Sequence, residues 1–448
     1  MNIDSLDPDI FSQTDHEAWL KLVDRALKGK DFQETLVSRT DDGIAIEPLY
    51  QRRGDSMPLS RQHTELPWTI TQRVDDPNHE RAMAQLDDDL ANGASGICLV
   101  AQDSASSFGI GMDAAEPNIS KVAAAAGRAT TLRLDGVPPF TVKGLIGSLA
   151  DAGVQSAHLG LDAFLAAVYS SNFHNDISHL LELNVAGTVI NADGRSVHNA
   201  GGTEAQELAV MAASLVGHLR LLEETGLSLE AALAAASLCL SADQNQFTTI
   251  AKMRAARLIF ARIAEACGVA EPPQAHLYAE TSYRMLTRLD PETNILRNTI
   301  AAFSAGVGGA DEISVLPHSL THGIPDPLAR RLARNMQTIL VAESHLDHVI
   351  DPAAGAGAIE ALTDALAEQA WNIFADIERK GGLPKVIASG ELMAMVATAR
   401  QSRVAKPIVG TTLFAMKTER PVVVLGSLGP ITGGMGLMPI RLSDGVEG

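Results

Sequence analysis

Aromatic residues and cysteines are scarce in this chain of 448 residues. Aromatic residues make up 4% of the composition, so Ala, Leu, Val and Ile must fill the core. Such side chains suit helices packed on a sheet. Cys98, Cys239 and Cys267 are odd in number and far apart, which argues against a disulfide framework. Cys98 and Cys239 lie in apolar stretches, so we expect buried free thiols in a reducing compartment.

Positive charge and long apolar runs are also lacking. The chain has 35 basic and 54 acidic residues, a formal net charge of −19. A field of that sign repels phosphate backbones and anionic lipids, which argues against nucleic acid and membranes as general partners. Residues 227–241 form the most apolar long stretch, but they contain Glu230 and are too short to span a bilayer. The stretch Met1–Phe11 has neither region of a signal peptide, so we expect a cytoplasmic protein.

Residues 1–60 are predicted to form an extended arm with one helix. Within residues 16–27 the apolar positions recur with helical spacing, and Gly29 follows as a stop signal. The apolar face of that helix contains Trp19, Leu22, Val23, Ala26 and Leu27. The following chain is polar and rich in turns, with an apolar anchor at Leu49 and Tyr50. We expect the arm to pack on another surface, either its own barrel or a partner protein.

Residues 61–405 alternate short branched runs with amphipathic helices. The runs predict strands at residues 97–101, 131–135, 156–159, 188–191, 235–240, 275–279 and 313–316. Helices are expected at residues 204–224, 247–267, 291–307 and 326–343. Seven strands, with one more not located, favour a closed (β/α)8 TIM barrel over an open sheet. Residues 406–448 are predicted to be a glycine-rich extension, with a strand-like segment at residues 421–425.

Candidate sites were weighed against structural roles. His318 and His322 have the spacing of two metal ligands on a helix, but no third ligand is evident, which favours a hydrogen-bonded loop pair. Residues 421–429 resemble a strand entering a glycine turn of a nucleotide-binding unit, yet no helix and second strand follow. Charged helical segments such as residues 328–334 are expected to face solvent. None of these motifs defines a ligand site.

Polar residues follow several predicted strands, where the active site of a barrel lies. They include Asp193 after one strand, Asp243 after the next and Glu280 after a third. Asp193 with Asp243 or Glu280 could form an acid–base pair, although buried structural carboxylates would have the same pattern. No His, Cys or Lys recurs there as an obvious base or nucleophile.

Several strings, in order along the chain, resemble the methylmalonyl-CoA mutase family, whose members use adenosylcobalamin. They lie at residues 21–50 (KLVDRALKGKDFQETLVSRTDDGIAIEPLY), 67–70 (PWTI), 198–209 (HNAGGTEAQELA), 243–257 (DQNQFTTIAKMRAAR), 290–309 (DPETNILRNTIAAFSAGVGG), 333–340 (ARNMQTIL) and 351–363. Each string is moderately specific, and together they cover most of the chain. The resemblance implies a (β/α)8 barrel that holds an acyl-CoA.

The same positions depart from the pattern of catalytic members. After PWTI, catalytic chains continue Arg-Gln-Tyr, where this chain has Thr71 and Arg73 at the outer two positions. A Tyr-His pair, whose His binds the thioester carbonyl, aligns with Arg195 and Ser196. A serine hydroxyl has neither the reach nor the pKa of an imidazole. These differences imply a degenerate active site.

Two further differences point the same way. The family's His-Thr-Asn on a late strand aligns with Ser314 through Leu316, and the leucine offers no polar contact. The Asp-x-His-x-x-Gly motif that ligates cobalt does not occur in the sequence. The resemblance therefore implies a non-catalytic small subunit in a heterodimer. Adenosylcobalamin and the isomerisation of methylmalonyl-CoA and succinyl-CoA would belong to a large catalytic partner, and this chain alone would hold no cofactor.

Two alternatives remain open from the sequence. The barrel could bind acyl-CoA and work with a separately encoded cobalamin-binding chain. It could also serve a binding or chaperone-like role for the cobalamin enzyme.

Overall fold

The computed structural model describes residues 15–114, 131–151, 156–164 and 186–447, with shorter pieces between 121 and 180. The stretch Met1–Phe11, in which we expect no targeting signal, lies outside the described residues. Among the described helices, none has the length and apolar character needed to cross a membrane.

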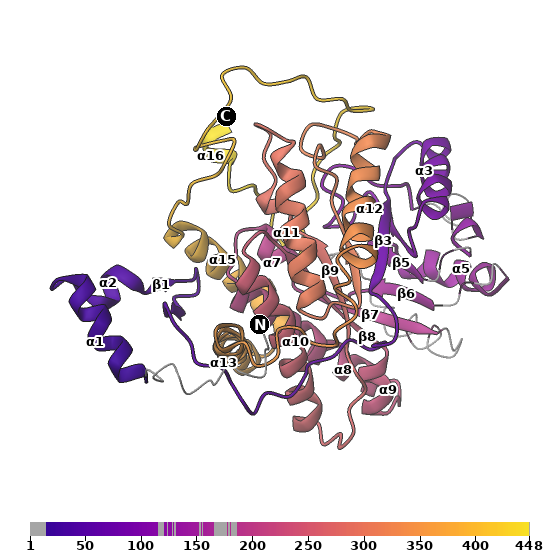
Figure 1. The fold of residues 1–448 in the computed structure, drawn as a ribbon. Helices are drawn as coiled ribbons and strands as arrows, with labels where there is room; N and C mark the ends of the chain where they lie inside the picture. Colours follow the sequence, from indigo (N-terminus) through magenta and orange to yellow (C-terminus); the bar gives the residue numbers. More distant parts are fainter. Residues whose placement is uncertain are drawn as a thin grey trace, which may run out of the picture.

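The described residues form a closed barrel of eight parallel strands, in the order β10-β3-β4-β5-β6-β7-β8-β9 (Figure 1). The strands are β3 (Thr69–Val74), β4 (Gly96–Val100), β5 (Thr131–Asp135), β6 (Ser156–Leu161), β7 (Gly187–Asp193), β8 (Ala236–Ala242), β9 (His276–Thr281) and β10 (Glu312–Ser314). Pairing of Ile313 with Ile70 closes the ring. The prediction of a (β/α)8 barrel is confirmed. The strand that the sequence left unlocated is β3, which begins within PWTI.

Helices alternate with the strands and cover the outside of the barrel. They are α3 (His79–Ala91), α5 (Pro139–Asp151), α7 (Arg195–Asn199), α8 (Glu204–Glu223), α9 (Leu229–Ala234), α10 (Gln246–Ala266), the 3-10 turn η3 (Tyr283–Met285), α11 (Thr293–Val307) and α12 (Pro327–Ala342). Capping residues determine where several of these helices begin. Thr203 and Gln206 form a reciprocal capping box on α8, and Asp326 caps α12 with Pro327 in its first turn. Strand leucines such as Leu132 and Leu238 pack in the main apolar core.

Helix α12 corrects one expectation. Its charged segment was expected to face solvent, but Arg330 and Arg334 are 4% and 2% exposed. Arg330 donates to Asp75 beyond the end of β3 at 2.9 Å, and Arg334 binds Asp89 of α3. The sequence prediction was wrong because these arginines lie on the inner side of the helix and meet acidic groups there.

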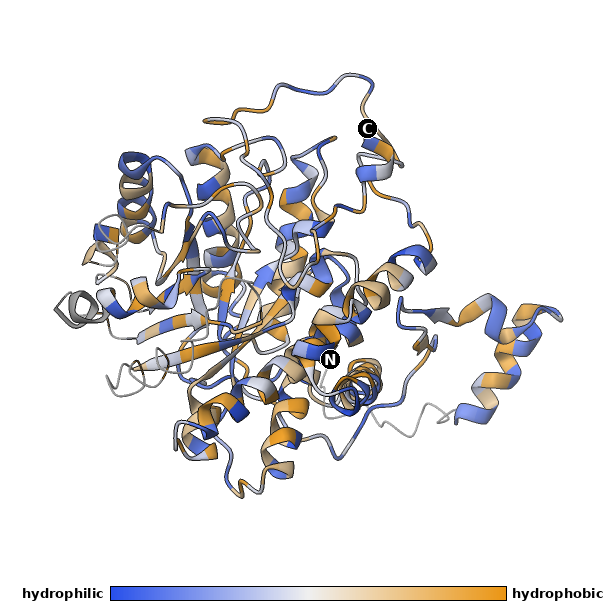
Figure 2. Cartoon of the chain, turned by 180° about the vertical axis from the view of Figure 1, so that it is seen from behind, coloured by the Kyte–Doolittle hydropathy of each residue, from blue (hydrophilic) through white to orange (hydrophobic). Residues whose placement is uncertain are grey.

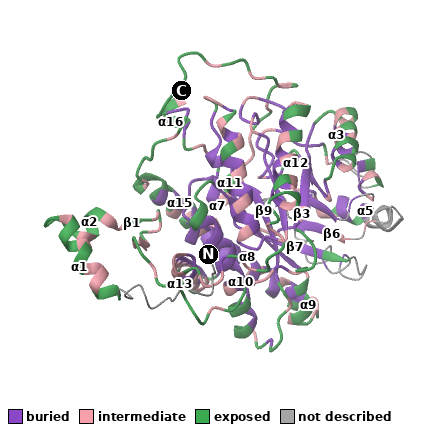
Figure 3. Ribbon diagram, in the orientation of Figure 1, coloured by how far each residue is buried: buried purple, intermediate pink, exposed green. Residues whose placement is uncertain are grey.

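The arm stands away from the barrel (Figure 1). It consists of α1 (His16–Leu27), α2 (Phe32–Leu36) and a small hairpin of β1 (Ser38–Arg39) and β2 (Ala45–Ile46). The predicted helix is confirmed, but it has no buried residue, and Figure 3 shows only intermediate and exposed positions on α1 and α2. In Figure 2 both helices carry hydrophobic as well as hydrophilic residues. Leu22 and Leu49 are 56% and 46% exposed, so part of the arm's apolar surface is not covered by the described residues.

The hairpin joins the arm to the body through polar contacts. The Asp42 carboxylate accepts from the Ala205 backbone N–H at the start of α8, at 3.2 Å. Asp41 pairs with Arg403 at 2.8 Å and with Lys406 at 3.1 Å. The junction therefore ties the arm, the barrel and the chain after residue 402 to one another.

After α12 the chain forms α13 (Gly357–Arg379), α14 (Leu383–Ala388) and α15 (Glu391–Ser402), and a tail of residues 406–448 ends in α16 (Asp444–Glu447). The tail crosses the carboxyl end of the barrel, here called the mouth, and is yellow in Figure 1. Backbone bonds tie it to the loops that follow three strands: Gly429 to Gly109, Leu425 to Ile324, and Leu442 to Arg284. Residues 421–425 make an isolated bridge between Val424 and Pro325 rather than the expected strand.

Candidate functional site

Arg133 lies in the middle of the barrel and binds side chains across it. It is fully buried on β5, which pairs with β4 and β6. Its guanidinium nevertheless donates to Glu312 of β10 at 2.8 Å and to Ser237 of β8 at 3.1 Å. It also lies 4.2 Å from the centroid of the Tyr278 ring. Contacts with strands that are not neighbours must cross the interior, so side chains fill the barrel axis at this level.

A second layer of charge lies nearer the mouth. Glu280 of β9 accepts from Arg73 of β3 at 2.5 Å and from Arg195 of α7 at 3.4 Å. Arg195 also binds Asp193 at 2.5 Å and Asp135 at 2.9 Å. Each of these side chains is at most 5% exposed. The carboxylates are thus shared among the arginines, and this layer too closes the axis.

An aromatic pair covers this layer. The ring of Phe108, in the loop after β4, stacks on Tyr283 of η3 with centroids 4.4 Å apart. The Arg73 guanidinium lies 5.9 Å from the Phe108 centroid on the inner side. Phe108 is 1% exposed and has a positive φ of 51°, a conformation that places a bulky side chain only where packing holds it. The adjacent Gly109 binds the tail. The mouth is therefore closed by a ring pair and then by the tail.

The pKa values of the charged side chains in the interior depend on burial and on their ion-pair partners. Burial alone would lower the pKa of Arg195, but Asp193, Asp135 and Glu280 raise it well above its usual value. Burial raises the pKa of Glu280 despite Arg73 and Arg195. Burial opposes ionisation of Asp135 as well, yet Arg195 and a hydrogen bond from Ser104 hold its pKa below the ordinary value. In this layer each of the three carboxylates therefore has an arginine as its partner.

The structure separates the six degenerate positions predicted from the sequence. Arg73 and Arg195 meet at Glu280, near the mouth. Thr71 lies deeper and donates to Glu312 at 2.7 Å. The other three positions have different surroundings: Ser196 is half-buried in α7, Ser314 is buried with no hydrogen-bond partner for its Oγ among the described residues, and Leu316 is buried in the apolar core. Only the two arginines therefore belong to one cluster.

The carboxylates considered as an acid–base pair have structural partners. Asp193 and Glu280 both bind Arg195, whereas Asp243 binds Arg284 at 3.2 Å in a different cluster. That second cluster also contains Lys252, which is buried and binds Glu204 and Glu207 of α8. Buried arginines hold Asp193 and Glu280 in fixed ion pairs, although burial raises the pKa of both carboxylates. The arrangement supports packing of the barrel rather than proton transfer.

Sequence reasoning did not identify several residues that fill the interior. Arg133 and Asp135 alternate with leucines in TLRLD, and in a barrel strand this period places them inside. That signal was available in the sequence. The stacking of Phe108 on Tyr283 carries no such signal, because the two loops meet only when the barrel has closed.

Two groups of side chains could hold a metal ion in the described part of the chain. One is His158, His276 and Glu312, and the other is His198, Glu204 and Asp243. The pair His318 and His322 is in neither group. His322 Nε2 bonds the Arg288 carbonyl at 2.8 Å, whereas His318 Nδ1 is buried with no hydrogen-bond partner among the described residues.

The comparisons with known proteins agree with this architecture. The model of the methylmalonyl-CoA mutase family matches residues 177–425. A methylmalonyl-CoA mutase small subunit of Streptomyces virginiae is 35% identical over 92% of this chain and 72% of that protein. A probable methylmalonyl-CoA mutase small subunit of Mycobacterium bovis is 48% identical over 43% of this chain, and the match spans 32% of that protein. Cereibacter sphaeroides methylmalonyl-CoA mutase is 28% identical over 92% of this chain and 66% of that protein.

Among solved structures, dihydropteroate synthase of Xanthomonas albilineans overlaps with a TM-score of 0.33 at 12% identity, covering 64% of this chain and 98% of that one. The fold and interior define a (β/α)8 barrel whose axis is filled by charged side chains and whose mouth is covered. The chain belongs to the methylmalonyl-CoA mutase family, a family of isomerases.

Proposed function

We propose that this chain is the small, non-catalytic subunit of a methylmalonyl-CoA mutase complex. A larger partner would carry the acyl-CoA and perform the isomerisation, and this barrel would stabilise the assembly in the cytoplasm. The observation that carries the proposal is the occupied barrel axis. Arg133 with Glu312, and Arg73 with Glu280 and Arg195, stand where a barrel enzyme needs space for its substrate.

The residues at the mouth do not fit adenosylcobalamin. A corrin ring needs an open face over the strands and groups that reach its substituents. Here Phe108 and Tyr283 cover that face, and the tail binds the adjoining loop at Gly109. We therefore place the cofactor on the partner chain. The six positions Thr71, Arg73, Arg195, Ser196, Ser314 and Leu316 have no catalytic role on this proposal.

The arm, residues 1–60, would bind the large subunit, while residues 61–405 form the barrel and residues 406–448 close it. Support comes from the exposed apolar side chains Leu22 and Leu49, which are 56% and 46% exposed. Because each is already about half covered, its complete burial in an interface would contribute roughly 1 kcal/mol. The polar junction at Asp41 and Asp42 would hold the arm in position for that contact.

The first test measures catalysis and assembly. The chain is co-expressed with its large subunit, and mutase turnover is compared for the complex, the large subunit alone and this chain alone with adenosylcobalamin. We expect turnover only when the large subunit is present, with a higher melting temperature for the complex. Turnover by this chain with a separate cobalamin-binding protein would instead establish the acyl-CoA-binding alternative. An equally stable and active large subunit by itself would contradict the stabilising role.

A second test addresses the arm. Leu49→Asp should weaken the complex at least about tenfold, the equivalent of roughly 1.4 kcal/mol, measured by calorimetric titration with the large subunit. Leu328→Asp is the matched control, because Leu328 is 59% exposed on α12 of the barrel. Equal affinities of the two variants for the large subunit would show that the arm is not part of the interface.

A third test addresses the barrel axis. Titration of the isolated chain with coenzyme A should give no heat of binding, while the large subunit gives a saturable signal under the same conditions. Tight binding of coenzyme A to this chain would overturn the interpretation of the filled axis.

A further inference from the structure

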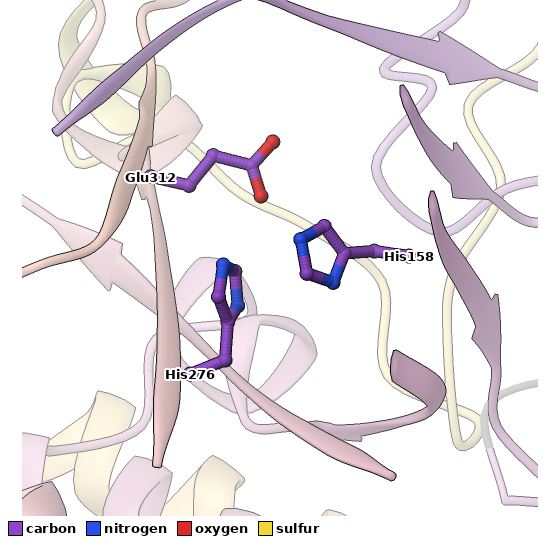
Figure 4. A group of neighbouring side chains, drawn as sticks. All are labelled: His158, His276 and Glu312. Atoms are coloured by element: carbon purple, nitrogen blue, oxygen red, sulfur yellow. The ribbon is translucent and has the colours of Figure 1, made fainter. Parts of the chain in front are cut away.

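Three side chains at the amino-terminal end of the barrel point toward one another (Figure 4). His158 comes from β6, His276 is the first residue of β9, and Glu312 is the first residue of β10. One ligand atom from each residue lies within 4.8 Å of the other two. Ligands of tetrahedral zinc are roughly 3.3 Å apart for metal–nitrogen bonds of about 2.0–2.1 Å. Small side-chain rotations would therefore bring the three donors onto one ion.

Hydroxyl groups set the orientation of both imidazole rings. Nδ1 of His158 lies 2.8 Å from Thr188 Oγ1, and Nδ1 of His276 lies 3.2 Å from Ser237 Oγ. If each Nδ1 donates its proton to the hydroxyl oxygen, Nε2 keeps its lone pair. In Figure 4 the outer nitrogen of each ring faces the Glu312 carboxylate. Hydroxyl or carbonyl partners on the second nitrogen are the usual support of metal-binding histidines.

Both imidazoles are buried, and burial favours their neutral form. Burial, followed by the charge of Arg133, lowers the pKa of His158 well below its ordinary value. Burial, followed by the neighbouring His158, does the same to the pKa of His276. Neutral rings bind metals without first losing a proton.

The carboxylate is held in place by its own contacts. Glu312 accepts from Thr71 at 2.7 Å through one oxygen and from Arg133 at 2.8 Å through the other. Each carboxylate oxygen has a second lone pair, so these contacts leave coordination possible. The positive charge of Arg133 opposes a cation, which limits the affinity of the site.

The other candidate group, His198, Glu204 and Asp243, already contains side-chain cations. Glu204 binds Lys252 and Arg284, and Asp243 binds Arg284. Two side-chain cations already lie among those carboxylates. At the amino-terminal end of the barrel, by contrast, Arg133 is the cation that contacts Glu312.

We propose that His158, His276 and Glu312 bind one zinc ion inside the amino-terminal end of the barrel. Imidazole nitrogens and a carboxylate oxygen are ligand types that zinc takes in proteins. The ion would connect β6, β9 and β10 and close the end of the barrel opposite the mouth. Its role is structural, and it goes beyond the proposed function of the subunit.

The test uses the full chain with any affinity tag removed. After treatment with a chelator and dialysis, the protein is titrated with zinc chloride by calorimetry, and bound zinc is counted by mass spectrometry after gel filtration. Cobalt(II) chloride is added to a second sample, because tetrahedral cobalt with nitrogen and oxygen ligands absorbs visible light. We expect one zinc per chain, a cobalt spectrum and a higher melting temperature with zinc.

Conservative variants assign the site. His158→Gln, His276→Gln and Glu312→Gln should each weaken zinc binding at least about tenfold, because loss of a group that only supports a ligand already costs about 10–100-fold. The matched control combines His318→Gln, His322→Gln, His345→Gln and His348→Gln, which removes two other histidine pairs and should keep the zinc. If a barrel variant fails to fold, the zinc stoichiometry and the cobalt spectrum of the control protein show whether zinc binds outside the two other histidine pairs. Loss of zinc in the control, or no stoichiometric zinc in the natural chain, would overturn the proposal.

Discussion

Phe108 stacks on Tyr283 with ring centroids 4.4 Å apart and ring planes inclined by 4°. The two residues belong to loops that follow β4 and β9, so the contact spans the mouth of the barrel. Stacking across two loops fixes their distance more firmly than either loop could do alone. The covered mouth and the filled axis are in contact, because the Arg73 guanidinium lies over one face of the Phe108 ring.

Removal of this ring should destabilise the barrel. Phe108→Ala is expected to lower the free energy of unfolding by about 3–5 kcal/mol, because a buried ring is lost and a cavity remains. Phe140→Ala is the matched control, since Phe140 is 73% exposed, and it should change the value by less than about 0.5 kcal/mol. Chemical denaturation followed by circular dichroism measures both. Similar effects of the two variants would show that the stack does not hold the mouth.

Glu280 connects two arginines, so its loss should be severe. Glu280→Ala leaves Arg73 and Arg195 without their shared carboxylate and should cost about 3–5 kcal/mol of stability. Glu265→Ala removes the exposed partner of Arg262 and should cost less than about 1 kcal/mol. Urea denaturation at neutral pH distinguishes the two. A change below about 1 kcal/mol for Glu280→Ala would mean that water enters the interior and solvates the arginines.

Asp42 predicts a pH dependence at the junction of arm and barrel. Burial raises the pKa of Asp42 from 3.8 to about 6, and nearby Glu204 adds to the rise. The folded state thus binds this proton more tightly than the unfolded state. Its stability falls as pH rises from about 4 to about 6, and the full penalty, roughly 3 kcal/mol, is present above that range. Asp42→Asn should therefore be more stable than the natural chain at pH 7 and equal to it near pH 4.

The neighbouring Asp41 supplies a control with the opposite sign. Hydrogen bonds and charge from Arg403 and Lys406 overcome burial and lower the pKa of Asp41. Its contribution is present above the unfolded pKa and is lost as pH falls through the folded value. Asp41→Asn should accordingly reduce stability at pH 7. Thermal unfolding of both variants between pH 4 and 7 checks the pair, and parallel curves would contradict the assignment.

Gly323 allows the tail to lie against the loop after β10. A Cβ at this position would lie 2.3 Å from the Gly426 carbonyl oxygen, so Gly323→Ala should displace the tail. Trypsin should then cleave after Lys417 about tenfold faster for each 1.4 kcal/mol by which the docking of the tail is weakened. Gly54→Ala is the control, because its Cβ would have no neighbour within 4 Å. Unchanged cleavage of the Gly323 variant would show that the tail is not held there.

The sequence predicted the barrel because alternating strands and helices leave a regular pattern. Seven strands were located within two residues of their observed ends. The eighth, β3, was not, since its run TITQRV is polar. Its polarity has a structural cause: Thr71 and Arg73 face the charged interior rather than an apolar layer.

The site was less predictable because its contacts cross the barrel. Leucines beside Arg133 indicate that the arginine points inward, but its partners lie on β8 and β10 and become adjacent only on closure. The arginines of α12 were misassigned for the same reason, since Asp75 and Asp89 are more than 200 positions away in sequence. Periodicity predicts which side of an element is buried, but not which charges meet there.

The crossing contacts of Arg133 also bear on how the chain folds. A fragment that ends after β6 would contain this arginine without Glu312 or Ser237, and so would leave a guanidinium beside apolar surface with no partner. Half-barrels are therefore poor intermediates here, and we expect the strands to become protected from hydrogen exchange together rather than one half after the other. Because buried charges on distant strands pair with one another, we expect the eight strands of this barrel to assemble in one cooperative step.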